Sequence, residues 1–161
     1  MYIVTTRFNT QTWRENKNYK NNLNKNDLNK NKQIKCIYGS PIRIRDNITP
    51  KISLFVLEMH NDQNKIKGIG YIKNVVYKTE RIYSDRNYNR YIYKGYRYIS
   101  RDKLNKSEKK IIRVLDILIF KGQRHIKRGQ GFSILPDWIT ENKHISFINF
   151  IKQVFIDHNE L

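Results

Sequence analysis

The first part of the chain carries its apolar residues in short runs separated by turn-forming residues, and this spacing most constrains the fold. The run Tyr2 to Thr6 is β-branched and aromatic, and the runs Ile52 to Met59 and Ile66 to Val76 are separated by a polar turn. Short runs of these residue types, with turns between them, predict β-strands rather than long helices. Gly68 and Gly70, inside the last run, favour a bulge or a tight bend that curves the sheet.

Towards the C-terminus the pattern changes to helical spacing. Apolar residues recur at helical intervals from Ser107, a good N-cap, to Phe120, and Lys121-Gly122 is a suitable stop. A second helix is predicted from about Glu141 to Ile156, after a short strand from Phe132 to Leu135. We therefore expect an α+β fold, with roughly six short strands in a small curved mixed sheet or open pseudo-barrel and two or three helices against it.

The length of 161 residues suits a single domain spanning residues 1–161. Residues 16–33 are mostly Asn and Lys, which predicts a flexible insertion on the surface. Cys36 is the only cysteine, so no disulfide can form within the chain, and there is neither a signal-peptide pattern nor an apolar run long enough to cross a membrane. These features predict a soluble intracellular protein, in the cytoplasm or nucleus, without a membrane partner.

The strongest functional signal is charge. The chain has 32 Lys and Arg against 14 Asp and Glu, a formal charge of +18. Such a surface repels itself, and neutralisation by the phosphates of RNA or DNA is the usual reason that it persists. Codon bias supplies an alternative source for part of the Lys and Asn, but it explains the shortage of acids poorly because Asp and Glu also have A-rich codons. The composition is similar to that of proteins from large DNA viruses, which adds a virion-associated location to the alternatives.

One basic segment stands out between the first predicted C-terminal helix and the last strand. We call residues 121–131 the basic loop: it has four fixed positive charges, three glycines and no acid. Glycines let main-chain amides approach an anion, and Lys and Arg supply charge, so the loop is predicted to bind phosphate. A solvated connector is the alternative. The candidate nucleic-acid contacts in it are Lys121, Arg124, His125, Lys127 and Arg128.

A second candidate surface is predicted from Arg90 to Arg101. A two-residue turn at Lys94-Gly95 would make a β-hairpin and place four tyrosines on one face. The tyrosines could stack unpaired bases or could be core residues. The phosphate candidates here are Arg90, Arg97 and Arg101, and the base-stacking candidates along the chain are Trp13, Tyr71, Tyr91, Tyr93, Tyr96 and Tyr98.

Signals for catalysis and metal binding are weak. No histidine pair has the spacing of a helical metal site and Cys36 stands alone, so we expect no metal and no cofactor. Glu58 and His60 would share one face of a strand, and His125 lies in the basic loop, where an acid or base of a nuclease could sit. Isolated residues of this kind are usually structural. The sequence therefore favours a binding protein over an enzyme but does not exclude an enzyme.

Several of these segments together resemble a known superfamily. The opening strand from Tyr2, the following Trp13, and the pair of runs Phe55-Val56-Leu57-Glu58 and Gly68-Ile69-Gly70-Tyr71-Ile72 look like the PUA-like superfamily, particularly its EVE and YTH branches. The resemblance covers about the first half of the chain. It implies a small pseudo-barrel that binds RNA or a modified base, with Trp13 near a base pocket and the Gly68 strand in the barrel wall.

Taken together, these patterns predict a nucleic-acid-binding protein, for RNA or DNA, that uses the basic loop and the Arg/Tyr hairpin; a reader of modified bases is one form of it. A viral structural or genome-packaging protein is the first alternative, and a nucleic-acid-processing enzyme is the second. A concave aromatic pocket beside the basic loop would favour a reader, whereas a flat basic face would favour packaging.

Overall fold

The computed structural model describes residues 1–25, 33–44, 48–78 and 80–161. Its centre is a mixed five-stranded sheet in the order β6-β4-β3-β1-β7. The strands are β1 (Tyr2–Phe8), β3 (Ser53–His60), β4 (Lys65–Lys73), β6 (Arg97–Ser100) and β7 (Ser133–Ile134). β1 runs parallel to β3, and the other neighbours are antiparallel. A separate antiparallel pair consists of β2 (Cys36–Ser40) and β5 (Tyr91–Gly95).

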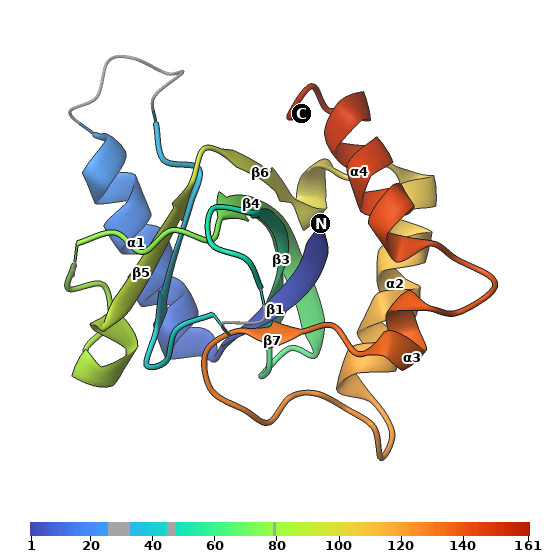
Figure 1. Cartoon of the computed structure of the whole chain (residues 1–161), viewed down its shortest axis with the longest axis horizontal. Helices are drawn as coiled ribbons and strands as arrows, with labels where there is room; N and C mark the ends of the chain where they lie inside the picture. Colours follow the sequence, from blue (N-terminus) through green and yellow to red (C-terminus); the bar gives the residue numbers. More distant parts are fainter. Residues whose placement is uncertain (26–32, 45–47, 79) are drawn as a thin grey trace.

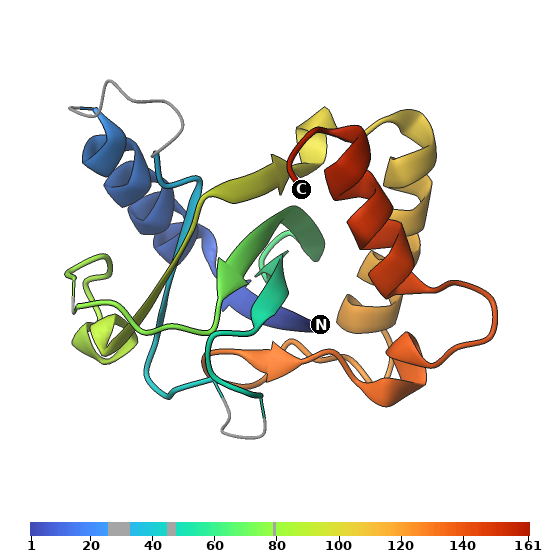
Figure 2. The ribbon, with the colours of Figure 1, turned by 45° about the horizontal axis from the view of Figure 1, so that its top comes forward.

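Helices and the small sheet cover the two faces of the central sheet (Figures 1 and 2). On one side lie α2 (Lys106–Phe120), the short α3 (Asp137–Thr140) and α4 (Phe147–Asp157). On the other side lie α1 (Thr10–Asn24) and the β2-β5 pair. Two short 3₁₀ helices, η2 (Arg86–Asn89) and η3 (Arg101–Lys103), flank β5 and β6. The predicted α+β class with a small mixed sheet is confirmed, and within the described residues the sheet does not close into a barrel.

Alternation along β3 divides the core between these two sides. Phe55, Leu57 and Met59 face the cluster that includes α2 and α4. Leu54 and Val56 face the cluster that includes β2 and β5. All five side chains are 0% exposed, so β3 is buried on both faces and is the central strand that its sequence predicts.

The segment predicted to be flexible begins as helix instead. Residues 16–24 belong to α1, whose N-cap is Asn9 and whose Asn16 is only 1% exposed. Asn16 donates hydrogen bonds to the Ile37 carbonyl at 2.7 Å and to the Tyr83 hydroxyl at 2.9 Å. These distant partners satisfy the two N–H donors of a side chain that composition alone assigns to the surface, while its buried Oδ1 has no partner among the described residues. The rest of the predicted insertion, residues 26–32, lies outside the described residues.

The predicted hairpin at Lys94-Gly95 is wrong. β5 pairs with β2 and β6 pairs with β4, so the chain passes from one sheet to the other and does not fold back (Figure 1). Gly95 is needed for close packing rather than for a turn: a Cβ atom there would lie 2.6 Å from Cys36 Sγ and closer still to the Tyr71 carbonyl oxygen. None of the helices in the described ranges combines the length and the apolar character that a bilayer crossing requires.

Candidate functional site

A cavity of about 330 Å³ opens at the N-terminal end of α1, beside the basic loop. We call it the α1 pocket. Its lining includes the aromatic side chains of Phe8, Tyr83 and Tyr88, and the basic loop contributes Lys127, Gly129 and Gly131. Tyr83 and Tyr88 meet edge to face, with ring centroids 6.3 Å apart. The structure therefore places a partly aromatic hollow directly beside the predicted phosphate loop.

Arg7, at the end of β1, ties the basic loop to the pocket. Its Nε donates to the Ile126 carbonyl at 2.8 Å, and Nη2 donates to Ser133 Oγ at 3.2 Å. Nη1 makes a longer bond of 3.4 Å to the Gly131 carbonyl. Among the described residues no carboxylate lies within 4.0 Å of this guanidinium. Burial lowers the pKa of Arg7, as expected for a half-buried cation without an anionic partner.

The last five residues of the basic loop have main-chain amides without a partner in the described chain, whereas the amides of Lys121, His125 and Ile126 donate to main-chain carbonyls. From Lys127 to Gly131 no amide N–H donates to an acceptor of the described chain. Gly129 has φ of 122° and Gly131 has φ of 65°, in the left-handed region that glycine adopts readily. The Lys127 carbonyl accepts a hydrogen bond from Asn61 Nδ2 at 3.0 Å, which fixes the loop at the pocket rim. Free amides in such a conformation form a concave donor surface that suits an anion.

The other basic-loop candidates are spread more widely. Lys121 and Arg128 are exposed, and the Arg124 guanidinium lies 5.6 Å from the centre of the Trp138 ring. His125 is half-buried, and its Nδ1 atom is buried without a hydrogen-bond partner. Of the five residues of the basic loop that the sequence predicts as nucleic-acid contacts, Lys127 is the one that lines the α1 pocket.

Two acids, Glu15 and Asp85, also line the α1 pocket. Asp85 caps η2 by accepting from the Asn87 amide at 3.0 Å. Glu15 accepts from the Ser84 hydroxyl at 2.8 Å and from Gln11 Nε2 at 3.1 Å. Burial acts to raise the pKa of Glu15, but these hydrogen bonds outweigh burial and lower it, so Glu15 is ionised at neutral pH.

The predicted Arg/Tyr surface is divided among several environments. Tyr93 is a core residue, 0% exposed, whose hydroxyl accepts from the Ile44 amide at 3.0 Å. Arg101 pairs with Asp116 at 2.8 Å and donates to the Ile66 carbonyl, so its guanidinium is already engaged. Arg90 is exposed, and half-buried Tyr91 lies under the Arg43 guanidinium. Tyr71, Tyr96 and Arg97 do come together, at a second hollow near the passage from β5 to β6.

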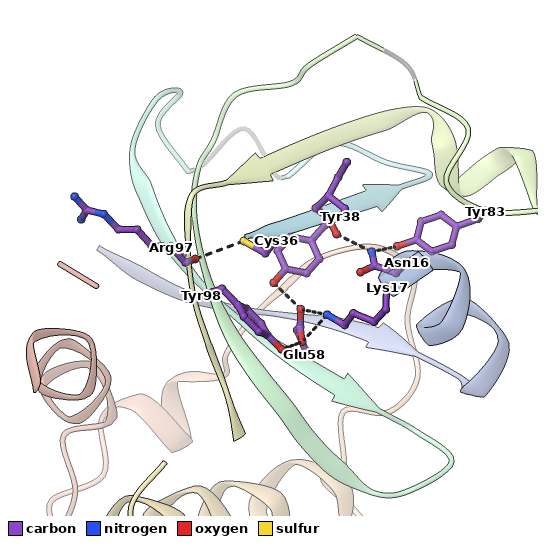
Figure 3. Close-up of polar contacts among 9 residues, drawn as sticks. Asn16, Lys17, Cys36, Tyr38, Glu58, Tyr83, Arg97 and Tyr98 are labelled. Atoms are coloured by element: carbon purple, nitrogen blue, oxygen red, sulfur yellow. Dashed lines mark hydrogen bonds and ion pairs between the residues drawn. The ribbon is translucent and has the colours of Figure 1, made fainter. Parts of the chain in front are cut away.

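Tyr98 belongs to a polar cluster around the buried Glu58 (Figure 3), and Trp13 contacts this cluster through Lys17. Glu58 is 0% exposed and accepts hydrogen bonds from Lys17 Nζ at 3.1 Å and from the hydroxyls of Tyr38 and Tyr98, each at 2.9 Å. The Lys17 ammonium lies 4.1 Å from the Trp13 ring centre and 5.0 Å from the Tyr98 ring centre. Burial, and then Glu58, raises the pKa of Tyr98, which keeps this hydroxyl protonated as a donor.

The contacts of this cluster indicate a structural role for Glu58. Its carboxylate is occupied by three donors, and the nearby His60 packs its ring 5.8 Å from Trp13. Within the described ranges no group of three or more His, Cys, Asp or Glu side chains is placed to hold a metal ion. The pairing of Glu58 with His60 considered from the sequence therefore gains no geometric support as an acid–base pair.

The most informative pocket residues were missed by the sequence patterns. The adjacent residues Arg7 and Phe8 are far along the chain from Tyr83 and Tyr88, and no local motif connects the two segments. One signal was present: Arg7 is the only charged residue in the opening strand, which is otherwise apolar or hydroxyl-bearing. Comparison of the chain with protein-family models, curated protein sequences and solved structures finds no match. The PUA-like relationship therefore stays a prediction.

Proposed function

We propose that the protein binds single-stranded nucleic acid, with one unpaired nucleotide entering the α1 pocket and its phosphate held by the basic loop. The observation that carries the proposal is Arg7: a half-buried cation with no carboxylate partner among the described residues, which donates to two carbonyls of the basic loop at the rim of a cavity. Buried charges in proteins are normally paired, so an anionic ligand is the partner that this arrangement lacks.

The size and lining of the α1 pocket support a nucleotide. Its volume of about 330 Å³ lies at the low end for ligand pockets, which suits one base rather than a large cofactor. Tyr88 is the half-buried aromatic residue of the lining, whereas Phe8 and Tyr83 are buried behind it, 3% and 4% exposed. Glu15 and Asp85 repel a phosphate but accept hydrogen bonds from base N–H groups. This division of charge favours a base inside the pocket and a phosphate at Lys127.

Two further considerations favour a reader of unpaired bases. Trp13 packs edge to face on Phe8 with ring centroids 5.4 Å apart, which agrees with the place near a base pocket that the PUA-like resemblance implies for it. A packaging protein needs only phosphate contacts, and a hollow that admits a base adds nothing to that task. A modified base is within the scope of the proposal, because the pocket encloses the part of a nucleotide that carries such modifications.

Fluorescence anisotropy with labelled oligonucleotides tests the proposal. Single-stranded RNA and DNA should bind more tightly than duplexes of the same length, and affinity should fall steeply with salt because counterions are released. Lys127→Ala should reduce the salt slope by about one unit. Tyr88→Ala should weaken binding by about tenfold through lost stacking.

The matched control is Lys143→Ala, because Lys143 is exposed in the loop between α3 and α4, away from α1. It removes the same charge and should change affinity much less than Lys127→Ala. Absence of binding at low salt would refute the proposal. Equal losses for both lysine variants, with no preference for single strands, would instead indicate non-specific charge neutralisation.

A further inference from the structure

A second hollow, of about 410 Å³, lies where the chain passes from β5 to β6. We call it the bend pocket. It is lined by three tyrosines and three cations, namely Tyr71, Tyr77, Tyr96, Lys73, Lys94 and Arg97, together with the backbone of Gly95. β5 and β6 follow one another between the two sheets at this point (Figure 1). The hollow is therefore built by the same passage that replaces the predicted hairpin.

Tyr96 stands out because it belongs to neither sheet. It lies between the end of β5 at Gly95 and the start of β6 at Arg97, and its side chain is 48% exposed. Within the described part of the chain, no other aromatic ring and no cation lies over its ring. An exposed, unstacked ring on a closely packed bend is a ready surface for another flat group.

Only one of the three cations in the bend pocket is neutralised. Lys94 forms an ion pair with Glu80, which also accepts from the Tyr19 hydroxyl at 2.6 Å. Arg97 and Lys73 have no carboxylate within 4.0 Å among the described residues. The Arg97 guanidinium lies 5.4 Å from the Tyr71 ring centre, which orients it at the pocket wall. No acid lines the pocket, so its unneutralised charge is entirely positive.

We infer that the bend pocket is a second nucleotide site, which stacks one unpaired base on Tyr96 and binds the adjacent phosphate through Lys73 and Arg97. An exposed tyrosine can stack on a flat aromatic group, and the neighbouring unpaired cations attract a negative charge. A nucleotide carries both features. This inference rests on the proposed function, because it takes the strand that enters the α1 pocket as the ligand. It adds that one strand contacts the protein at two separated places.

Two sites on one strand have a measurable consequence. An oligonucleotide that spans both pockets binds the second site as an intramolecular event, so its affinity rises above that of either site alone. Affinity should therefore increase in a step as oligonucleotide length rises within a range of about 2 to 16 nucleotides. With a single site, affinity should rise only gradually with length.

The experiment measures anisotropy for unstructured single strands of increasing length, with wild-type protein, Tyr96→Ala and Lys73→Ala. Both variants should remove the step and weaken binding of the longest strands by about tenfold, while the shortest strands still bind at the α1 pocket. Tyr2→Ala is the matched control, because Tyr2 is an exposed tyrosine, 40% accessible, that lines neither pocket. Circular dichroism checks that all variants fold.

The outcomes separate the two proposals. If Tyr96→Ala and Lys73→Ala bind every length as the wild type does while Tyr88→Ala is impaired, the bend pocket is not a nucleotide site and the α1 proposal stands. If no strand of any length binds, both fail. If a polyglutamate peptide binds in a Tyr96-dependent way and oligonucleotides do not, the bend pocket serves an acidic protein partner, and the inference is overturned.

Discussion

The Tyr98 hydroxyl lies against the bare α-carbon of Gly68. A Cβ atom at residue 68 would be 2.5 Å from Tyr98 Cζ and closer still to the hydroxyl oxygen. Gly70 has the same relationship to Tyr38, since a Cβ there would lie 3.0 Å from Tyr38 Cζ. The two glycines of β4 thus leave room for the two hydroxyls that bind Glu58.

Gly68→Ala should destabilise the fold by about 1–3 kcal/mol, because the added methyl group overpacks a buried site and displaces a donor from Glu58. Urea unfolding monitored by tryptophan fluorescence measures the change. The Gly68→Ala/Tyr98→Ala double variant is the control: with the ring gone, the methyl group should cost much less than it does alone. Additive losses in this cycle would contradict the contact.

Arg7→Met should loosen the basic loop and weaken oligonucleotide binding. The change removes the donors that hold the Ile126 carbonyl and Ser133, and it removes the half-buried charge proposed to face the ligand. Limited trypsin digestion should then cleave faster within residues 121–131. Arg113→Met is the matched control, because Arg113 is exposed on α2, outside the basic loop, and its loss leaves every trypsin site of residues 121–131 in place. Equal cleavage rates for the two variants would show that Arg7 does not anchor the loop.

His60 should make the protein less stable as the pH falls. Burial, and then Lys67, lowers the pKa of His60 below its ordinary 6.5, so the unfolded chain takes up this proton more readily than the folded one. The contribution of His60 to stability is therefore complete above about pH 6.5 and is lost as the pH falls through the lower folded-state pKa. Unfolding midpoints in urea across this range should fall less for His60→Gln than for the wild type. His144→Gln removes an exposed imidazole and is the control. If both variants reduce the pH dependence of the unfolding midpoint equally, His60 has no specific role.

Cys36 should be inert in the folded protein. It is 1% exposed, and burial, reinforced by Glu58, raises the pKa of its thiol to about 12. The thiolate is the reactive form, so an Ellman reagent at mildly alkaline pH should label Cys36 only after denaturant is added. Rapid labelling in native buffer would mean that the β2-β5 pair opens easily.

The elements that the sequence predicted well are those with a strong local period. β1, β3 and β4 follow short apolar runs bounded by turn-forming residues, and α2 follows apolar residues at helical spacing. All four form close to the expected residues. The Lys94-Gly95 turn failed because Gly95 is required by contacts with Tyr71 and Cys36, which no local pattern can reveal. Residues 16–24 of α1 were misjudged for the same reason, since Asn16 is held by residues more than twenty positions away.

The parts of the candidate site also differ in how far the sequence could predict them. The basic loop was recognisable from charge and glycine content alone, and its binding of phosphate stays a prediction. The α1 pocket was not recognisable, because Phe8, Tyr83 and Lys127 meet only after three distant segments have packed. Of the tyrosines expected to share one face, Tyr93 is in the core and Tyr96 is exposed, because the bend between the sheets separates them.

The position of β1 has a consequence for biosynthesis. It precedes both of its partner strands in the chain, so one edge must wait for β3 and the other for β7, and Leu135 completes the pairing by donating to the Ile3 carbonyl. Until β7 has been synthesised, nascent β1 has an open edge that can pair with other chains. Arg7 likewise gains its loop partners only at that stage. Chains that stall before this point are the ones that should need a chaperone.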